Sequence, residues 1–238
     1  MNTACRFFIT LVSIMTLCHQ AYAERHLEVG GYLTTTTVPD DSFAFFSSDT
    51  TVLPQFGPDI RFEVADIRDT VHLLPYLAYR YGAANGDPII NSGIMHTGLI
   101  LHDISAGLRG RIWILSWLGG YAQVFTGVSF INMEGEIDQN GQTGMHNRYV
   151  DDAVKWHVGG GLGLELRVSP RQLEKTSLRR LNFGGEIGMG FVKRMQTNFN
   201  PTLEGGDDLS LSNVKTTNFG DIDLSGVLFQ MGLTVSFR

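Results

Sequence analysis

The sequence predicts an all-β fold, specifically an eight-stranded antiparallel transmembrane β-barrel that is closed and up-and-down. Three observations predict it: apolar and polar residues alternate with a period of two, glycine is frequent at 28 of 238 residues, and long connections alternate with short ones. A period of two places successive side chains on opposite faces of a strand. After residue 23, no apolar stretch reaches the roughly 18 residues that a membrane helix needs.

The N-terminus has the pattern of an export signal. Arg6 precedes an apolar run over residues 7–17, and Ala21-Tyr22-Ala23 gives the small-x-small pattern that signal peptidase recognises. We therefore expect a cleavable signal peptide over residues 1–23 and a barrel domain over residues 24–238. Lipidation at Cys18 is the alternative, but Leu17 stands where a lipobox has a small residue.

The composition of the mature chain excludes several classes of function. Both cysteines, Cys5 and Cys18, lie within the predicted signal, so no disulfide or thiol chemistry is expected. The remaining 215 residues carry 17 basic and 24 acidic side chains, a net charge of −7. This balance argues against nucleic acid as a partner, and nothing in the sequence calls for a cofactor or a metal.

The alternation is clearest in three runs near the C-terminus, over residues 154–168, 181–191 and 227–237. In the first, the even positions are apolar apart from Gly160, while the odd positions are charged, histidine or glycine. Weaker runs over 27–33, 59–64, 71–81, 103–114 and 122–130 bring the total to eight. The longer runs exceed the usual 5–6 residues of a globular strand and suit a tilted membrane strand of about 9–11 residues with extensions.

The connections between these runs supply independent support for the barrel. Long connections are predicted over 38–56, 83–96, 135–152 and 194–221, short ones over 66–69 and 115–118, and an intermediate one over 169–179. Membrane barrels have long extracellular loops and short periplasmic turns, so both termini are expected in the periplasm. A soluble β-sandwich is the alternative, but it has no reason to show this pattern. Pro75 lies within a run and predicts a bulge or a shorter strand there.

These features together resemble the small OmpA-like, OmpX-like or OmpW-like outer-membrane barrels. The resemblance rests on the export signal, the eight alternating runs and the aromatic ending Val235-Ser236-Phe237, after which Arg238 departs from the usual terminal Phe. It is architectural, covers the whole mature chain and contains no motif of one family. It implies contact with outer-membrane lipid and lipopolysaccharide, and recognition of the last strand by the barrel-assembly machinery.

The inward faces of the predicted strands carry balanced charge, which forms the candidate site. The acids and bases are equal in number, and His157 and His72 accompany them. The candidate lumen charge network consists of Glu28, Asp59, Arg61, Glu63, Arg80, Asp103, Arg109, Arg111, Lys155, His157, Glu165, Arg167 and Glu186. Buried charges are costly unless paired, so we interpret the network as ion pairs that fill a lumen too narrow for an open pore. A narrow polar pathway is the alternative.

Catalysis is not expected. His157 and Glu165 share one strand face but lie eight residues apart, roughly 26 Å at about 3.3 Å per residue, so they are not partners. His157 could instead meet Ser129 or Glu186 from neighbouring strands. The Gly159–Gly163 region superficially looks like a phosphate loop, but it lies within a strand and no helix follows, so it indicates small lumen residues.

The predicted outer loops hold acidic pairs, such as Asp40-Asp41, Asp151-Asp152 and Asp207-Asp208, and an aromatic group of Phe43, Phe45 and Phe46. The aromatic group could form a contact surface or pack on the barrel mouth. Three functions remain open: a monomeric structural or surface-interaction protein, a narrow channel for small polar or amphipathic solutes, and a lipid-modifying barrel enzyme. The first is the one that we expect.

Overall fold

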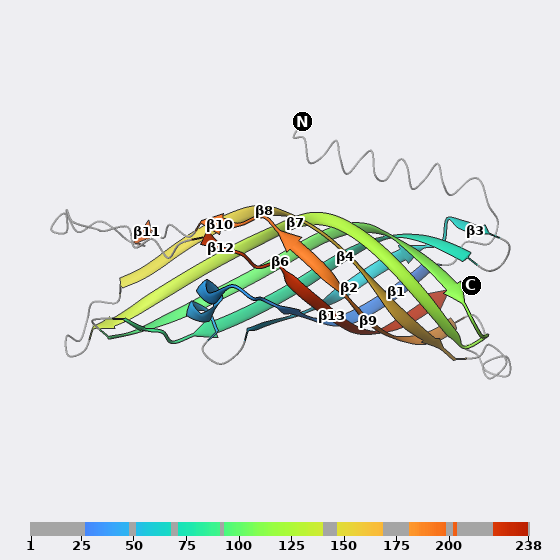
Figure 1. The fold of residues 1–238 in the computed structure, drawn as a ribbon, viewed down its shortest axis with the longest axis horizontal. Helices are drawn as coiled ribbons and strands as arrows, with labels where there is room; N and C mark the ends of the chain where they lie inside the picture. Colours follow the sequence, from blue (N-terminus) through green and yellow to red (C-terminus); the bar gives the residue numbers. More distant parts are fainter. Residues whose placement is uncertain are drawn as a thin grey trace, which may run out of the picture.

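A computed structural model shows a closed antiparallel β-barrel (Figure 1). The structure describes residues 27–47, 51–67, 71–90, 93–139, 147–168, 181–198, 202–203 and 221–237. The predicted signal peptide, Asp207-Asp208, the 169–179 turn and Arg238 lie outside these residues, so the expectations for them stay predictions. Among the described residues, no helix is both long and apolar enough to span a membrane.

Eight strands form the barrel, and each pairs antiparallel with its neighbours in the chain. They are β1 (Leu27–Thr37), β2 (Val52–Phe62), β4 (Val71–Gly86), β6 (Gly93–Trp113), β7 (Leu118–Gln139), β8 (Asn147–Arg167), β9 (Leu181–Arg194) and β13 (Gly226–Phe237). β1 pairs with β13 along its whole length, from Leu27 opposite Phe237 to Thr37 opposite Val227. This pairing closes the barrel and confirms the predicted fold class.

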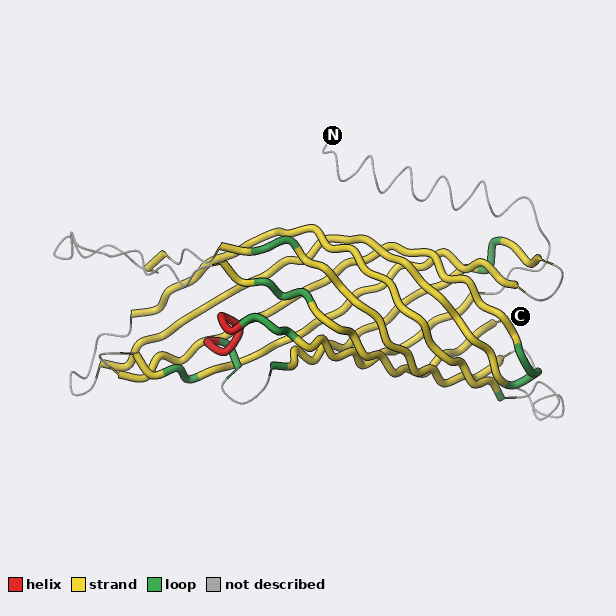
Figure 2. Tube along the Cα trace, viewed as in Figure 1, coloured by secondary structure: helices red, strands yellow, loops and turns green. Residues whose placement is uncertain are grey.

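Short elements extend the barrel at its two ends. β3 (Ala65–Ile67) pairs with the start of β4, and β5 (Ile89–Ile90) folds back onto β6. β10 (Thr197–Asn198) pairs with β12 (Asp221–Ile222), β11 (Thr202–Leu203) pairs with β8, and η1 (Asp41–Phe45) is a single 3-10 turn. We call the end that holds Leu27 and Phe237 the base, and the opposite end, which holds η1, the mouth (Figures 1 and 2).

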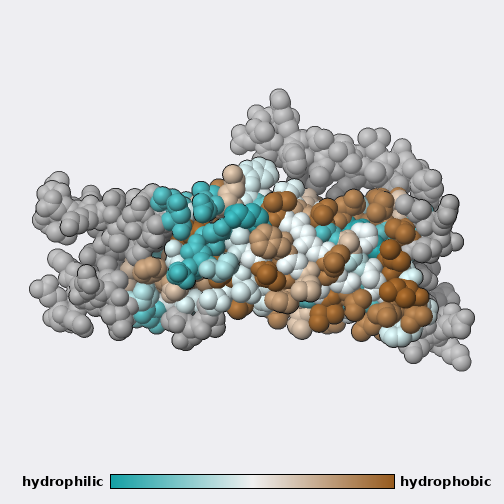
Figure 3. All heavy atoms as spheres, in the orientation of Figure 1, coloured by the Kyte–Doolittle hydropathy of each residue, from teal (hydrophilic) through white to brown (hydrophobic). Residues whose placement is uncertain are grey.

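An apolar belt surrounds the barrel between these ends. Its side chains are exposed, as for Leu233 at 75%, Leu162 at 65% and Val124 at 63%. Figure 3 shows hydrophobic residues over the part of the barrel toward the base and hydrophilic residues toward the mouth. The belt follows the alternation of the sequence, with apolar side chains outward and polar side chains inward, as a lipid-facing strand requires.

The bulge predicted at Pro75 lies on the neighbouring β2–β3 segment instead of on β4 itself. β4 continues through Pro75, which is paired in register with Leu108 of β6. On its other side, pairing stops at Arg61 opposite Tyr76 and resumes at Ala65 opposite Leu73. Three residues of the β2–β3 segment thus lie opposite two residues of β4. One extra residue on one of two paired strands is the mark of a β-bulge.

Three predicted loops are shorter than expected, because the strands continue into them. β6, β7 and β8 are 21, 22 and 21 residues long, so most of 83–96 and much of 135–152 is strand, and β2 already begins at Val52. The side-chain pattern inverts in these extensions. In β7, Ile131 and Met133 are buried while Asn132 and Glu134 face outward. The extensions therefore lie beyond the belt, and their outer face is polar.

Candidate functional site

The candidate site is the lumen, whose base half contains a network of buried charges. Glu28 comes from β1, Asp59 and Arg61 from β2, Arg109 and Arg111 from β6, Glu165 from β8 and Glu186 from β9. All are at most 6% exposed. Because inward positions of adjacent strands lie level across a narrow barrel, residues that are far apart in the sequence meet at its centre.

Glu186 is the hub of this network. Its carboxylate accepts hydrogen bonds from the guanidinium groups of both Arg61 and Arg109, with Arg109 Nη1 2.7 Å from Oε2. Arg61 Nη2 also donates to Asp59 Oδ2 at 3.0 Å. Such charge-assisted hydrogen bonds are among the stronger contacts in proteins, and here they link β2, β6 and β9 across the lumen.

Arg111 holds the layer nearest the base. It donates to both oxygens of Glu28, from Nη1 at 2.7 Å and from Nη2 at 2.6 Å. Its Nε lies 2.7 Å from Glu165 Oε2. Arg80 approaches Asp59 at 3.9 Å from the other side. The network thus contains four guanidinium groups and four carboxylates, and the charges balance.

Aromatic side chains fill the space that the ion pairs leave. The Tyr121 ring lies 3.9 Å from the Arg109 guanidinium carbon, and the Tyr32 ring lies between Arg61 and Arg80 at 5.1 and 4.9 Å. These are cation–π distances. The rings can enter because each lies opposite a glycine of the next strand.

Four inward aromatic side chains share this arrangement. A Cβ atom on the facing glycine would collide with the ring in every case. The cross-strand pairs are Tyr32 with Gly232, Tyr76 with Gly107, Tyr121 with Gly163, and Phe125 with Gly159. The glycine-rich stretch of β8 therefore gives room for lumen aromatics, in agreement with its interpretation as small lumen residues.

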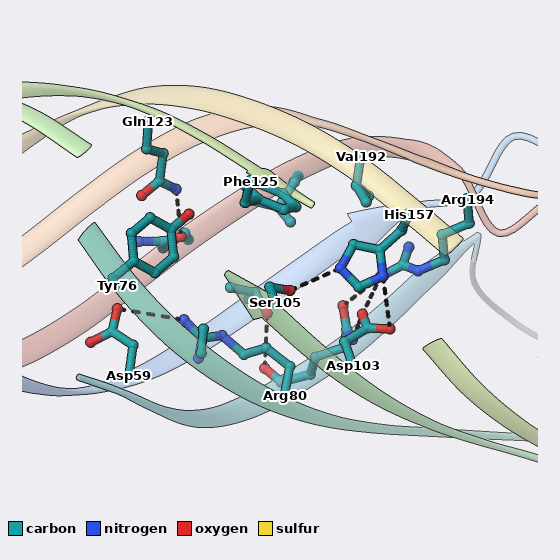
Figure 4. A pocket seen from close by; sticks show the side chains of 15 residues that line it. Asp59, Tyr76, Arg80, Asp103, Ser105, Gln123, Phe125, His157, Val192 and Arg194 are labelled. Carbon is teal, nitrogen blue, oxygen red and sulfur yellow. Dashed lines mark hydrogen bonds and ion pairs between the residues drawn. The ribbon is translucent and has the colours of Figure 1, made fainter. Parts of the chain in front are cut away.

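A second polar cluster lies further toward the mouth (Figure 4). Asp103 of β6 accepts hydrogen bonds from Arg194 Nη2 at 2.6 Å, Ser129 Oγ at 2.6 Å and Gln55 Nε2 at 2.8 Å. His157 of β8 lies next to this carboxylate. Its Nδ1 is 2.9 Å from Ser129 Oγ and its Nε2 is 2.8 Å from Ser105 Oγ.

The serine, histidine and aspartate of this cluster have the residue types of a nucleophile, a base and an orienting acid. However, Ser105 is 8% exposed and His157 is 3% exposed. The cavity beside them has a volume of about 40 Å³, which is space for a few water molecules. The cavity can hold water, while a substrate of ordinary size has no room.

An apolar cluster, which we call the plug, lies at the mouth above this cluster. Phe43 of η1 and Phe46 directly after it are each 1% exposed, and they pack against Leu99, Leu101 and Met133 on the inward faces of the strand extensions. Val38, Leu53, Ile131, Ile222 and Leu224 complete the plug. Of the two expectations for the aromatic group, the structure shows packing on the barrel mouth.

Asp40 fastens the plug to the last connection of the chain. One carboxylate oxygen accepts from Ser42 N at 2.8 Å and caps η1, and the other accepts from Asp223 N at 2.7 Å. Partial burial would raise the pKa of the Asp223 carboxyl. The hydrogen bonds from Lys193 and Ser225 outweigh it and hold that pKa below its usual value.

The structure does not bring all predicted lumen residues into one network. Asp103 and His157 belong to the second cluster, and Arg167 stacks on Trp113 at the base, 5.3 Å from the ring. Glu63 lies against His72 at the rim of the base. Lys155 is half-buried and belongs to neither cluster. His157 meets Ser129, as one of its two expected partners, while Glu186 belongs to the base network.

Arg194 is the functional residue that the sequence analysis missed. It is 1% exposed and ion-paired with Asp103, yet the predicted loop over 194–221 began with it. The even-numbered positions from Asn182 onward point inward in β9, and extending that alternation by two residues beyond Val192 would have placed Arg194 in the lumen.

A closed barrel with charged groups inside and an apolar belt outside is suited to a membrane. The chain folds as a closed β-barrel of the transmembrane type. No family model matches the barrel's sequence, and no curated protein matches it.

Solved structures of outer-membrane proteins resemble the barrel, as the sequence led us to expect. The attachment invasion locus protein Ail of Yersinia pestis is 11% identical, with 91% of this chain and 100% of that chain covered and a TM-score of 0.42. The outer-membrane protease OmpT from Escherichia coli is 7% identical, with 90% and 96% covered and a TM-score of 0.44. The N-terminal barrel of Pseudomonas aeruginosa OprF is 12% identical, with 89% and 97% covered and a TM-score of 0.33. At these identities and TM-scores, no activity transfers to this chain.

Proposed function

We propose that this protein is a closed, non-conducting barrel of the outer membrane with a structural or surface-interaction role. The observation that carries the proposal is the presence of two seals in series along one lumen. The base half is filled by balanced ion pairs around Glu186, and the mouth is filled by the apolar plug around Phe43 and Phe46.

Both seals oppose passage of solutes. Leaving a buried charge without its partner costs about 3–5 kcal/mol, and two ion pairs share Glu186. The apolar plug offers no polar group to a hydrated ion. The lumen therefore serves to hold the strands together, and the exposed parts of the barrel carry the interactions.

The proposed partners follow from the outer surface. Outer-membrane lipid and lipopolysaccharide cover the apolar belt, and the assembly machinery recognises the last strand, β13, which ends with an exposed Phe237. The mouth lies at the cell surface and both termini lie in the periplasm. We expect a monomer, without a nucleic-acid partner and without a cofactor.

Conductance of the purified protein in a planar lipid bilayer tests this proposal. We expect no steady single-channel openings at a protein level where a known porin, inserted under the same conditions, conducts. Steady openings that disappear on mutation of Arg109 or Glu165 would contradict the proposal and establish the alternative, a narrow channel. The polar cavity of about 40 Å³ between the seals is the feature that favours this alternative.

The proposal also holds that the protein is not an enzyme. Its support is the confinement of Ser105, His157 and Asp103 between the seals. A lipid-modifying enzyme would change lipid A, so mass spectra of lipid A from a deletion strain and its parent should be identical. A mass difference restored by the intact gene, but not by a His157→Ala variant, would assign an activity to the second cluster.

A further inference from the structure

A cluster at the rim of the base is separate from both seals. It consists of Glu63, Asp66 and His72, which lie where β2 ends and where β3 and β4 form a hairpin. We propose that these three side chains form a binding site for a divalent transition-metal ion, with zinc as the representative ion.

The positions of the ligand atoms fit such an ion. His72 Nδ1 lies 2.9 Å from Glu63 Oε1 and 4.0 Å from Asp66 Oδ2, and all three atoms lie within 4.8 Å of one another. Zinc binds nitrogen and carboxylate oxygen at about 2.0–2.2 Å, so its tetrahedral ligands lie about 3.3 Å apart. The observed spacings bracket this value, and small side-chain rotations bring the atoms to it.

The backbone holds the ligands in place before any ion binds. Asp66 and His72 are cross-strand partners in the β3–β4 hairpin, so their side chains emerge on the same face. A hydrogen bond from Val64 N to Leu73 O at 3.0 Å fixes the same hairpin next to Glu63. Preorganisation of this kind reduces the entropy that binding must otherwise cost.

The charge of the cluster favours a cation. Two carboxylates lie beside one imidazole, which is neutral when it binds a metal. The cationic group nearest in register is Arg111, the partner of His72 on β6. The two oxygens of Glu28 and the carboxylate of Glu165 already balance it. Glu63 and Asp66 would therefore bring two negative charges to an ion bound at the rim.

The ligand set also selects the class of ion. Imidazole favours zinc and its transition-metal neighbours, whereas magnesium and calcium prefer ligand sets of oxygen alone. Three protein ligands leave a fourth position for water. The Asp66 side chain is 38% exposed while those of His72 and Glu63 are 15% exposed, so the site opens to solvent on the Asp66 side and an ion can enter there.

Calorimetric titration of Zn²⁺ into the folded full-length barrel in detergent micelles tests the proposal. We expect one site per chain, and an affinity reduced by about tenfold or more in both His72→Ala and Asp66→Asn, which is the loss known even for the outer partners of metal ligands. X-ray absorption of the zinc-loaded protein should show a nitrogen and oxygen shell at about 2.0–2.1 Å.

Two comparisons keep the test decisive. His102→Ala is the matched histidine control, because His102 Nδ1 bonds to the Tyr79 hydroxyl at 2.7 Å on another face of the barrel, and its Zn²⁺ affinity should equal that of the parent. Asp66→Asn keeps the shape of a half-exposed side chain, so it folds even if His72→Ala does not. The proposal is overturned by absence of Zn²⁺ binding in the parent, by binding that Asp66→Asn leaves unchanged, or by equal affinity for Mg²⁺ and Zn²⁺.

Discussion

The two halves of the lumen are filled by opposite chemistry. Toward the base, guanidinium groups and carboxylates pair around Glu186, while at the mouth Phe43, Phe46 and their neighbours form an apolar plug. Both fillings are buried. They differ in the outer face of the strands around them, which is apolar around the base half and polar around the extensions at the mouth.

This difference shows that the outer environment decides which face of a strand is polar. Within the belt, lipid requires apolar side chains outside, and the polar ones must pair inside. Beyond the belt, water accepts polar side chains outside, and the interior becomes an ordinary apolar core. In β7 the change occurs between Phe130, which is outward and 43% exposed, and the buried Ile131 and Met133. Side chains still alternate between the two faces across this boundary, but the apolar ones change from the outward face to the inward face.

Removal of the Glu186 carboxylate, in the base half, should lower the free energy of unfolding most strongly. Glu186→Ala leaves Arg61 and Arg109 buried without their shared partner, so we expect a loss of about 3–5 kcal/mol in the free energy of unfolding. Denaturant unfolding of the barrel in lipid vesicles measures it. The control is Asp152→Ala, which removes an exposed acid at the mouth and should change stability by about 0.5 kcal/mol or less. Equal effects of the two variants would contradict the central role of Glu186.

A pair of outward substitutions locates the boundary between the two halves. Leu162→Arg places a charge in the middle of the belt and should cost about 2–4 kcal/mol, whereas Asn132→Arg, in the extension of β7, should cost about 0–1 kcal/mol. The same vesicle unfolding assay measures both. A cost for Asn132→Arg as large as for Leu162→Arg would mean that lipid also surrounds the extensions.

Loosening the plug should have the smallest effect. Asp40→Ala removes the cap of η1 and the acceptor for Asp223 N, so we expect a loss of about 1 kcal/mol, confined to the mouth. Hydrogen exchange of the Ser42 and Asp223 amides should accelerate, while strand amides near Glu186 keep their protection. Asp41→Ala, an exposed neighbour, is the matched control. If exchange near Glu186 accelerates as well, the two halves are coupled.

The sequence predicted the part of the fold that lipid dictates. Long apolar faces such as that of β8 are continuous, so the eight strands and the inward direction of Glu28, Arg111 and Glu165 followed from alternation alone. The pairing of these three across the lumen needed only the strand directions. Which carboxylate serves as the hub depends on barrel stagger, and a period of two contains no information on it.

The parts that escaped prediction lie where the environment changes. The predicted run of β7 stopped at Phe130 because Asn132 and Glu134 end the apolar face, although the apolar residues continue on the other face at Ile131 and Met133. Arg194 was left out of the predicted strand for a similar reason, because Lys193 ends the outward apolar run of β9. Where the apolar residues switch from the outward to the inward face, the pattern looks like the end of a strand unless the two faces are followed separately.

The aromatic–glycine pairs of the lumen also constrain the register between neighbouring strands. Tyr121 and Phe125 lie four residues apart on β7, and the glycines that face them, Gly163 and Gly159, lie four apart on β8. A shift of two residues in one direction would set Tyr121 against Glu165, and a shift in the other would set Phe125 against His157. Only the native alignment of these three accepts both rings, so the two rings fix the register of β7 against β8.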